Sequence, residues 1–514
     1  MKAFFTALAI IVAIALGVYF SSPNTAQSAS PHNRVNVIAP WEINSIDPAQ
    51  AGAIFQRMNL AETLVEADAS GQLVPNLARS WSSNDEASLW RFQLREGVVF
   101  HNGEPLTAQA VANSLNIAKT KPGVLQQALV EQIQVAAPDE IEIQLRKPLV
   151  AFPAYLTHYS TLILAEQAYN AQGDVQQLIG TGAFQAKKIE IPQKLTAERF
   201  ERYWGELPQL AQANYIASSR SETRMLMAQS DPASLVFNLD PASVDRLKND
   251  PALSLNSVSI ARTIQLKMDI GKPFFQDPII RKALSKAIDR RAIAQQVLKI
   301  KNGAADQLLP PLFSEWRIER PAIDYSTAQI KAALMSAGYH YTDAGILTDQ
   351  KGQPFQFTLR TFADRPELPL IATILQDQWR KIGVEVKVSV GNFSEIPAGH
   401  QDGSLEMALY AFNYGKTLDP VSALTQVFAE QGSDWGVMNW QNSHLTQTFR
   451  QLEKERDPVR ANTLKQKASQ IIAEELPIIP VVYYQQNVVA HKAMGNVILD
   501  PFERRFFLEK LKPE

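Results

Sequence analysis

Residues 408–420, ALYAFNYGKTLDP, bring together side chains that suit the binding of a small molecule. Tyr410, Phe412 and Tyr414 alternate at the end of a predicted strand that leads into a loop. Clefts that bind small molecules are typically lined by aromatic side chains with a few polar groups. The alternative is that the three rings pack in the core. Asp419 precedes a proline, which also suits a turn or a helix cap.

The sequence lacks the motifs of common catalytic and metal centres. It has no cysteine, which excludes disulfides, thiolate metal sites and cysteine nucleophiles. Neither HExxH nor GxSxG occurs, and the seven histidines lack metal-ligand spacing. We therefore predict a protein that is not an enzyme and has no catalytic residue, cofactor or metal ligand. A hydrolase that uses a carboxylate pair among its 52 acidic residues is the remote alternative.

Composition indicates an ordinary globular chain with several domains. A chain of 514 residues exceeds what one compact core accommodates, so two or three domains are expected. The net charge of −2, with no basic cluster among aromatics, gives no reason to expect a nucleic-acid partner.

The first thirty residues follow the order of a secretory signal. Lys2 precedes an apolar run over 3–20, and small and polar residues follow. We predict a signal peptide over 1–28, cleaved after Ser28, and a periplasmic protein that is not a lipoprotein, because it has no cysteine to modify. The run is long enough that an uncleaved membrane anchor is the alternative.

Periodicity in the rest of the chain predicts a mixed α/β protein. Residues 90–95 alternate as a half-buried strand, and a tight turn at Asn102-Gly103 leads to a helix over 108–117 with Thr107 as its N-cap. Further along, a helix over 367–382 stops at Gly383 and is followed by valines at period two. Helix–strand alternation of this kind builds α/β layers.

Taken in order, several segments closely resemble the peptide/nickel-type (family 5) extracellular solute-binding proteins that feed ABC importers. They are 45–48 (SIDP), 60–65 (LAETLV), 73–81 (LVPNLARSW), 90–111 (WRFQLREGVVFHNGEPLTAQAV), 180–184 (GTGAF), 201–208 (ERYWGELP), 277–293 (DPIIRKALSKAIDRRAI), 379–383 (WRKIG) and 476–484 (LPIIPVVYY). The resemblance covers nearly all of the chain after residue 35.

The resemblance implies a periplasmic binding protein fold with two lobes joined by two crossing hinge strands. We place the crossings at 263–270 and 479–490. Lobe I would comprise 29–265 plus 485–514, with an extra subdomain at about 65–180, and lobe II would comprise 266–484. Two such strands permit the lobes to close around a ligand.

The resemblance also points to individual ligand residues. Peptide-binding members carry an aspartate for the peptide's amino group where this chain has Lys416, which instead suits a carboxylate or another anion. A gap in the loop would bring Asp419 into that role. Arg365 falls near the arginine that clamps the ligand carboxylate, unless it is a solvated side chain paired with Asp364. His158 and Trp435 fall in other ligand regions of the family, with structural roles as the alternative.

The implied function is the solute-binding component of an ABC importer, a monomeric protein that delivers a peptide-like small solute to an inner-membrane permease. The alternative is a nickel or metal-chelate binding protein. The nickel branch's own ligand residues do not carry over: its loop tryptophan is Tyr414 here, its tyrosine is Leu418, and no histidine lies between 419 and 439.

Overall fold

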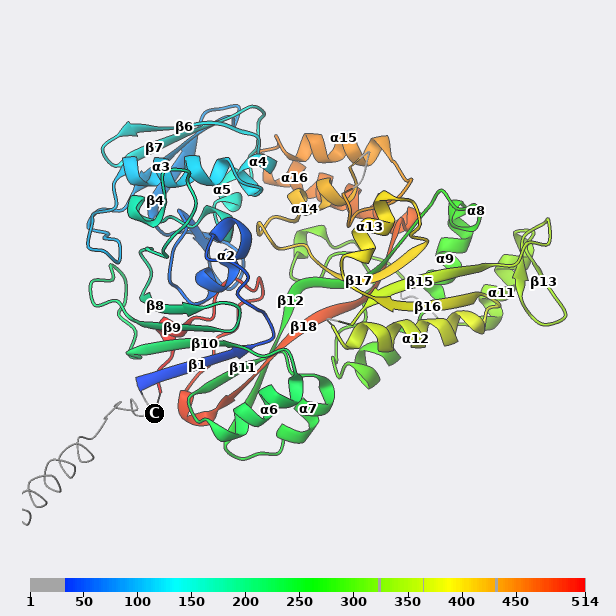
Figure 1. Cartoon of the computed structure of the whole chain (residues 1–514). Helices are drawn as coiled ribbons and strands as arrows, with labels where there is room; N and C mark the ends of the chain where they lie inside the picture. Colours follow the sequence, from blue (N-terminus) through cyan, green and yellow to red (C-terminus); the bar gives the residue numbers. More distant parts are fainter. Residues whose placement is uncertain (1–32, 322–324, 364, 430–432, 514) are drawn as a thin grey trace, which may run out of the picture.

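The computed structural model describes residues 33–321, 325–363, 365–429 and 433–513. The predicted signal peptide, 1–28, lies outside the described residues. Two lobes lie side by side and share one long twisted sheet (Figure 1). The predicted α/β, two-lobed architecture is therefore confirmed. No helix of the described ranges is both long and apolar enough to cross a membrane.

Ten strands form the shared sheet. In chain order they are β1 (Arg34–Ala39), β8 (Phe184–Glu190), β9 (Lys194–Arg199), β10 (Gln212–Ala217), β11 (Ser234–Phe237), β12 (Leu253–Met268), β15 (Gln356–Phe362), β16 (Glu385–Gly391), β17 (Met407–Asn413) and β18 (Ile478–His491). Their spatial order is β16-β15-β17-β12-β18-β11-β1-β10-β9-β8. The long central pair, β12 and β18, is antiparallel and connects the two halves of the sheet.

The central strands run from one lobe into the other. At one end β18 pairs with β11, and at the other end β12 pairs with β17. β18 nearly coincides with the predicted crossing at 479–490, while β12 begins at Leu253, well before the predicted 263. A bulge between Ser259 and Thr263 interrupts its pairing with β18, at the point where the strands leave the first lobe.

The first lobe carries a small sheet of its own. Its strands are β4 (Ala78–Ser83), β5 (Leu89–Leu94), β7 (Glu140–Leu145) and β6 (Val130–Ala137), in that spatial order, and helix α3 (Ala108–Lys119) packs beside them. The alternation predicted for 90–95 is confirmed, because Trp90, Phe92 and Leu94 are buried. Thr107 caps α3 by accepting a hydrogen bond from the Ala110 amide, as predicted.

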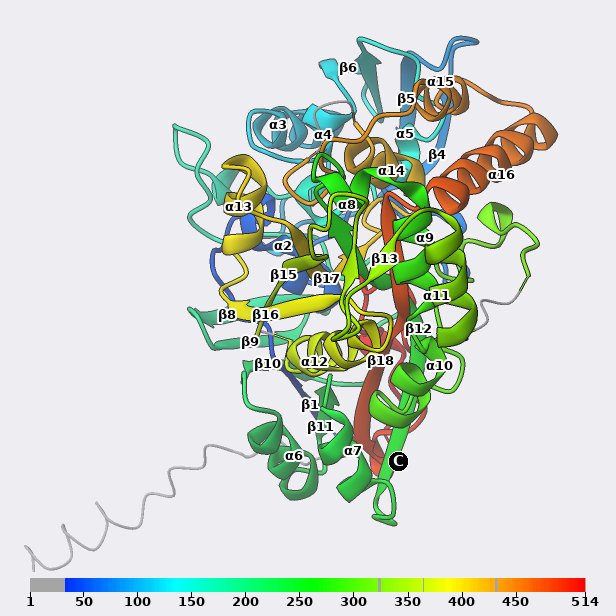
Figure 2. The same ribbon diagram turned by 90° about the vertical axis from the view of Figure 1, so that its right-hand side faces the viewer.

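The second lobe covers its sheet with helices on both sides (Figure 2). They are α8 (Pro273–Gln276), α9 (Pro278–Lys286), α10 (Arg290–Ala292), α11 (Thr327–Ser336), α12 (Glu367–Arg380), α13 (Glu395–Gln401), α14 (Pro420–Val427), α15 (Ser443–Leu452) and α16 (Pro458–Glu475). The fully buried Trp379 of α12 donates a hydrogen bond to the Leu284 carbonyl of α9, 3.0 Å away. α12 ends at Arg380, two residues before the predicted 382, and the chain then turns at Gly383, whose φ of +82° and close approach to the Gly345 carbonyl both favour glycine.

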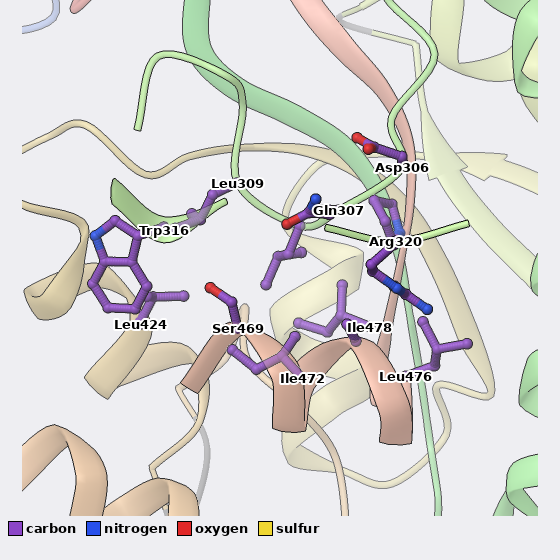
Figure 3. Close-up of a pocket in the computed structure, with 13 residues that line it drawn as sticks. Asp306, Gln307, Leu309, Trp316, Arg320, Leu424, Ser469, Ile472, Leu476 and Ile478 are labelled. Atoms are coloured by element: carbon purple, nitrogen blue, oxygen red, sulfur yellow. The ribbon is translucent and has the colours of Figure 1, made fainter. Parts of the chain in front are cut away.

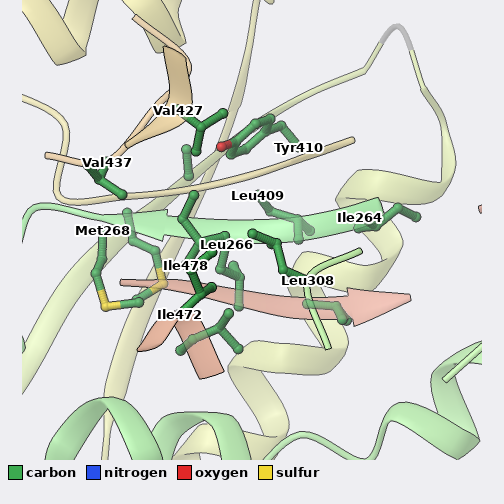
Figure 4. Packing of buried hydrophobic residues seen from close by; sticks show 14 of the residues in the cluster. Ile264, Leu266, Met268, Leu308, Leu409, Tyr410, Val427, Val437, Ile472 and Ile478 are labelled. Carbon is green, nitrogen blue, oxygen red and sulfur yellow. The ribbon is translucent and has the colours of Figure 1, made fainter. Parts of the chain in front are cut away.

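The largest core lies in this second lobe. Leu266 and Met268 of β12, Leu409 of β17 and Ile478 of β18 meet there (Figure 4). A separate core holds β1, β10 and β11 together, and a third lies under the four-stranded sheet. The residue boundaries assigned to the lobes and the extra subdomain stay a prediction.

The remaining elements are short. They are α2 (Pro48–Arg57), α4 (Val124–Gln127), α5 (Phe152–Tyr155), α6 (Ser221–Ser230), α7 (Pro241–Leu247), β2 (Val65–Ala67), β3 (Leu73–Pro75), β13 (His340–Tyr341) and β14 (Leu347–Thr348).

Candidate ligand-binding site

Three loops of the second lobe emerge toward the first lobe. β15, β16 and β17 are parallel, and Asn413, the last residue of β17, lies opposite Arg262 in the middle of β12. Since β12 continues from there into the first lobe, the carboxyl ends of all three strands face that lobe. We call the region between these strand ends and the first lobe the lobe junction. Ligands of open α/β sheets bind at the carboxyl ends of parallel strands. The loops that follow β15 and β17 contain Arg365 and Lys416.

The predicted aromatic residues of β17 and its loop lie on one face and are largely internal. Tyr410 and Tyr414 are fully buried. Tyr414 donates to the Gln265 amide oxygen at 2.8 Å, the Gln265 amide donates to the Tyr410 oxygen at 2.9 Å, and Tyr410 donates to the Trp435 carbonyl at 2.7 Å. Burial raises the pKa of both phenols. Phe412, between them, is half-buried.

Gly415 brings the following loop close to the central strand. A side chain at this position would meet Ala261 at 2.5 Å and the Phe502 ring at 2.8 Å. This close approach leaves Lys416 exposed at the junction, with its Nζ 6.0 Å from the centre of the Phe412 ring. Although the side chain reaches solvent, desolvation by the protein around its ammonium group, together with the charge of Arg262, lowers the pKa of Lys416. Lys416 makes no ion pair with any acidic residue that the structure describes.

His158 approaches the same place from the first lobe. It caps the short helix η2 (Tyr159–Thr161), and its Nδ1 accepts from the Ser160 amide at 3.2 Å. Its ring lies on that of Tyr159, with centroids 3.9 Å apart. Burial, and then the nearby charge of Lys416, lower the pKa of His158 to about 3, so the imidazole is neutral at physiological pH.

Arg365 lies against the crossing strand β18. Its guanidinium carbon is 5.2 Å from the centre of the Tyr484 ring, and the Tyr484 hydroxyl donates to Glu367 at 2.7 Å. Burial opposes the arginine's charge, but Tyr484, Glu367 and Glu503 together raise its pKa. Asp364, the partner in the alternative interpretation of Arg365, lies outside the described residues.

Glu503 lies among several cations at the junction. It accepts from the Arg262 guanidinium at 2.9 Å, and its backbone carbonyl accepts from Arg57 at 2.6 Å. Burial favours the neutral acid, yet Arg262, Arg57 and Arg365 lower the pKa of this carboxyl. The Nε of Arg262 is buried without a hydrogen-bond partner. With Lys416 beside Arg262, positive charge exceeds negative charge here.

Asp419 and Trp435 complete the set of predicted site residues. Asp419 caps α14 by accepting from the Val421 amide at 2.8 Å, and burial raises its pKa. Trp435 is half-buried and stacks on Phe393, with ring centroids 4.7 Å apart. The structure thus brings Lys416, His158 and Arg365 to the lobe junction, whereas Asp419 is held by its helix.

Sequence reasoning missed Arg262, Tyr484, Glu503 and Phe393. Arg262 and Tyr484 belong to β12 and β18, so each polar residue near the predicted crossings was a candidate by position alone. Glu503 and Phe393 are in connecting segments, and no spacing in the sequence distinguishes them.

The two lobes touch directly. The Val150 amide of the first lobe donates to the Glu453 carbonyl of the second at 2.9 Å, and Arg456 donates to the Ser83 hydroxyl at 2.7 Å. Ala154 packs into the core of the second lobe. The lobes are therefore in contact beside the charged residues of the junction, while Lys416 still reaches solvent.

A small pocket lies apart from this junction, inside the second lobe (Figure 3). Leu309, Leu424, Ile472 and Ile478 give it an apolar wall, while Asp306, Gln307 and Arg320 lie toward one end (Figure 3). None of the predicted site residues lines it. Within the described ranges, no group of three or more histidine, aspartate or glutamate side chains could hold a metal ion.

The chain is similar to several characterised binding proteins along its whole length. It is 22% identical to the nickel-binding periplasmic protein of Escherichia coli K12, over 99% of this chain and 98% of that protein. It is 21% identical to the dipeptide-binding protein of the same organism, over 85% of each. Both relatives are substrate-binding proteins rather than enzymes.

Solved structures share the fold. NikA from Brucella suis, in complex with Fe(III)-EDTA, has a TM-score of 0.86 at 22% identity and covers 94% of this chain and 100% of its own. The oligopeptide-binding protein AppA from Bacillus subtilis, in complex with a nonapeptide, has a TM-score of 0.77 at 20% identity, with 94% and 99% covered.

A family profile covers most of the chain. The profile described as bacterial extracellular solute-binding proteins, family 5 Middle, matches residues 72–435. This agrees with the family expected from the sequence motifs. The chain belongs to the family 5 bacterial extracellular solute-binding proteins and serves as the solute-binding component of an ABC importer.

Proposed function

We propose that the protein binds a small, peptide-like solute with at least one carboxylate at the lobe junction and delivers it to an inner-membrane ABC permease. The observation that carries this proposal is the excess of positive charge from Arg262, Arg365 and Lys416 over the two nearby carboxylates, Glu503 and Glu367. An anionic ligand would offset this excess, and a guanidinium fork suits a carboxylate.

Lys416 argues against a free amino group as the main recognition element. An ammonium group beside the lysine would meet a like charge in a partly dry environment. A solute whose amine is blocked, or whose negative charges outnumber its positive ones, fits better. Similarity to the dipeptide-binding protein of Escherichia coli supports a peptide-like skeleton.

A metal chelate rich in carboxylates is the second candidate. Similarity to the nickel-binding periplasmic protein, and to NikA in complex with Fe(III)-EDTA, favours it. The same cations would then bind the chelator's carboxylates, and the metal would be cargo. Native mass spectrometry of protein from its own periplasm distinguishes the two, because a chelate adds the mass and isotope pattern of a metal.

Replacing Arg365 or Lys416 with alanine should weaken solute binding by about one to two orders of magnitude. A charged hydrogen bond contributes ~1.5–3 kcal/mol, and each ~1.4 kcal/mol corresponds to one decade in Kd. Calorimetry with the solute identified by mass spectrometry measures this loss. Arg380→Ala, an exposed arginine of α12 in the same lobe, should bind as wild type does. If the Arg365→Ala and Lys416→Ala variants also bind the solute as tightly as wild type does, the proposal of an anionic solute is wrong.

Solute binding should close the lobes about β12 and β18. Small-angle scattering should give a smaller radius of gyration for the saturated protein than for protein freed of solute by unfolding and refolding. Two connecting strands allow this hinge motion with little change inside each lobe. An unchanged radius at demonstrated saturation would contradict the hinge.

The lobe boundaries and cellular location belong to the same proposal. Lobe I comprises 29–265 and 485–514, with its subdomain at about 65–180, and lobe II comprises 266–484. The mature protein begins near residue 29 after cleavage of a signal peptide, works as a soluble periplasmic monomer and carries no lipid.

A further inference from the structure

One aromatic side chain of the second lobe stands out by its exposure. Phe393 is 49% exposed, and it is the only exposed phenylalanine, tyrosine or tryptophan among the described residues. It lies in the turn between β16 and α13, at the carboxyl edge of the sheet that also presents Arg365 and Lys416. An apolar ring kept in water at such an edge costs free energy unless something covers it.

The turn holds Phe393 in a defined position. The Asn392 amide donates to the Glu395 carboxylate at 3.0 Å, and the Glu395 amide donates back to the Asn392 carbonyl at 3.0 Å. On its inner side the Phe393 ring stacks on Trp435 at an interplanar angle of 27°. The Phe362 ring meets both edge-on, with centroids 5.5 and 6.5 Å away.

The segment of Trp435, on whose ring Phe393 stacks, is itself held by hydrogen bonds. The Trp435 carbonyl accepts the Tyr410 hydroxyl at 2.7 Å, and the preceding carbonyl, of Asp434, accepts the buried Lys267 ammonium at 2.6 Å. The Tyr410 ring lies 5.3 Å from that of Trp435. Phe393 and Trp435 therefore form a rigid platform.

The platform is continuous with the cationic end of the site. The Phe412 ring is 6.3 Å from that of Tyr410, and Lys416 lies over Phe412. A row of rings thus leads from Lys416 to Phe393. Tyr410, in the middle of the row, is buried, so a solute whose carboxylate reaches the cations would meet the row at the half-buried Phe412 and Trp435 and at the exposed Phe393.

We propose that the Phe393–Trp435 platform is a specificity subsite that stacks a flat aromatic or heteroaromatic group of the solute. This inference rests on the proposed function and adds the side-chain class to it. Offset stacking on an aromatic face favours such a group over an aliphatic one of similar size. The expected gain in affinity over a small side chain is about tenfold.

The test uses two N-acetylated dipeptides that share a free carboxylate and differ in one side chain, tryptophan or alanine. Calorimetry with the full mature protein should show that wild type binds the tryptophan peptide about tenfold more tightly. Phe393→Ala should remove this preference and leave the Kd of the alanine peptide unchanged, while Phe393→Leu should restore little of it. Leu370→Ala, an equally exposed apolar residue of α12, should keep the preference.

The outcomes separate this inference from the proposed function. Equal binding of both peptides by wild type would overturn the platform and leave the carboxylated solute standing. A Phe393→Ala variant with wild-type melting temperature that retains the preference would also overturn it. Failure of wild type to bind either peptide would overturn the peptide-like solute, and the platform with it.

Discussion

Replacing Glu503 with alanine is expected to lower the free energy of unfolding by about 3–5 kcal/mol. The carboxylate is buried and is the ion-pair partner of Arg262, 2.9 Å away. Removing it leaves the Arg262 charge at the junction without compensation. Chemical denaturation of wild type and variant measures the difference.

The expected loss of stability is large because Arg262 is not the only cation near the Glu503 carboxylate. Arg57 and Arg365 both act on this carboxyl, and Arg262 already has one buried nitrogen without a partner. Once the carboxylate is gone, these guanidinium groups repel one another in a poorly solvated place. The surrounding turn should survive, because the Asp500 carboxylate fixes it by accepting from the amides of Phe502 and Arg504.

A double-mutant cycle isolates this effect. Glu503→Ala combined with Arg262→Met should be less destabilised than Glu503→Ala alone, because the orphaned charge is removed as well. Glu96→Ala serves as the matched control. The Glu96 side chain is 80% exposed and 3.8 Å from Arg79, so its loss should change stability by less than ~0.5 kcal/mol. A Glu503→Ala variant as stable as the Glu96 control would show that the junction charges are solvated.

Local signals predicted where several elements of the fold begin and end. Thr107 caps α3 as predicted, and Asp277 followed by Pro278 caps α9 in the same way, because a short polar side chain that accepts an amide hydrogen bond fixes where a helix begins. Gly383 turns the chain just after α12 through its positive φ angle. Each of these helix ends depends only on residues within one or two helical turns, so a short stretch of sequence contains all the residues that take part.

The roles of the aromatic residues could not be decided in the same way. Alternation correctly placed Tyr410, Phe412 and Tyr414 on one face of β17 and its loop. Which of them the second lobe would cover depends on the distant segment around Trp435 and on Gln265 of β12. Such contacts join residues far apart in the sequence, and no periodicity reports them.

The pairing of charged residues at the lobe junction could not be predicted from local sequence either. Arg262 and Glu503 are 241 positions apart and meet only because β12 passes beside the segment that follows β18. Lys416 and Arg365 were identified from family resemblance, since their local sequence would suit a surface charge just as well. The sequence therefore predicted the framework of this site better than its electrostatics.

The buried cation Lys267 should make the free energy of unfolding depend on pH. Lys267 of β12 has no exposed surface, and its ammonium contacts the Asp434 carbonyl at 2.6 Å and His400 Nδ1 at 2.8 Å. Burial lowers the pKa of Lys267 to about 7, and the charge of Asp434 offsets this only in part. In the unfolded chain a lysine has a pKa of about 10.4.

Between pH 7 and about 10.4 the unfolded state therefore binds more protons at this position than the folded state. Stability then rises with pH, by up to ~1.4 kcal/mol per pH unit. Below pH 7 the lysine is protonated in both states, and the full cost of burying its charge is present. Burial and the charge of Lys267 lower the pKa of His400, so its titration lies mainly below this window.

From pH 7 to pH 9 the wild type should gain about 2 kcal/mol of unfolding free energy relative to Lys267→Met, because methionine cannot titrate. Denaturation curves of both proteins at pH 7, 8 and 9 measure the difference, and the subtraction cancels the titrating groups that do not interact with Lys267. Lys387→Met, which removes an exposed lysine of β16, should keep the wild-type pH dependence. If Lys267→Met also keeps it, then Lys267 holds its proton throughout this range, and its contacts with Asp434 and His400 compensate the charge in full.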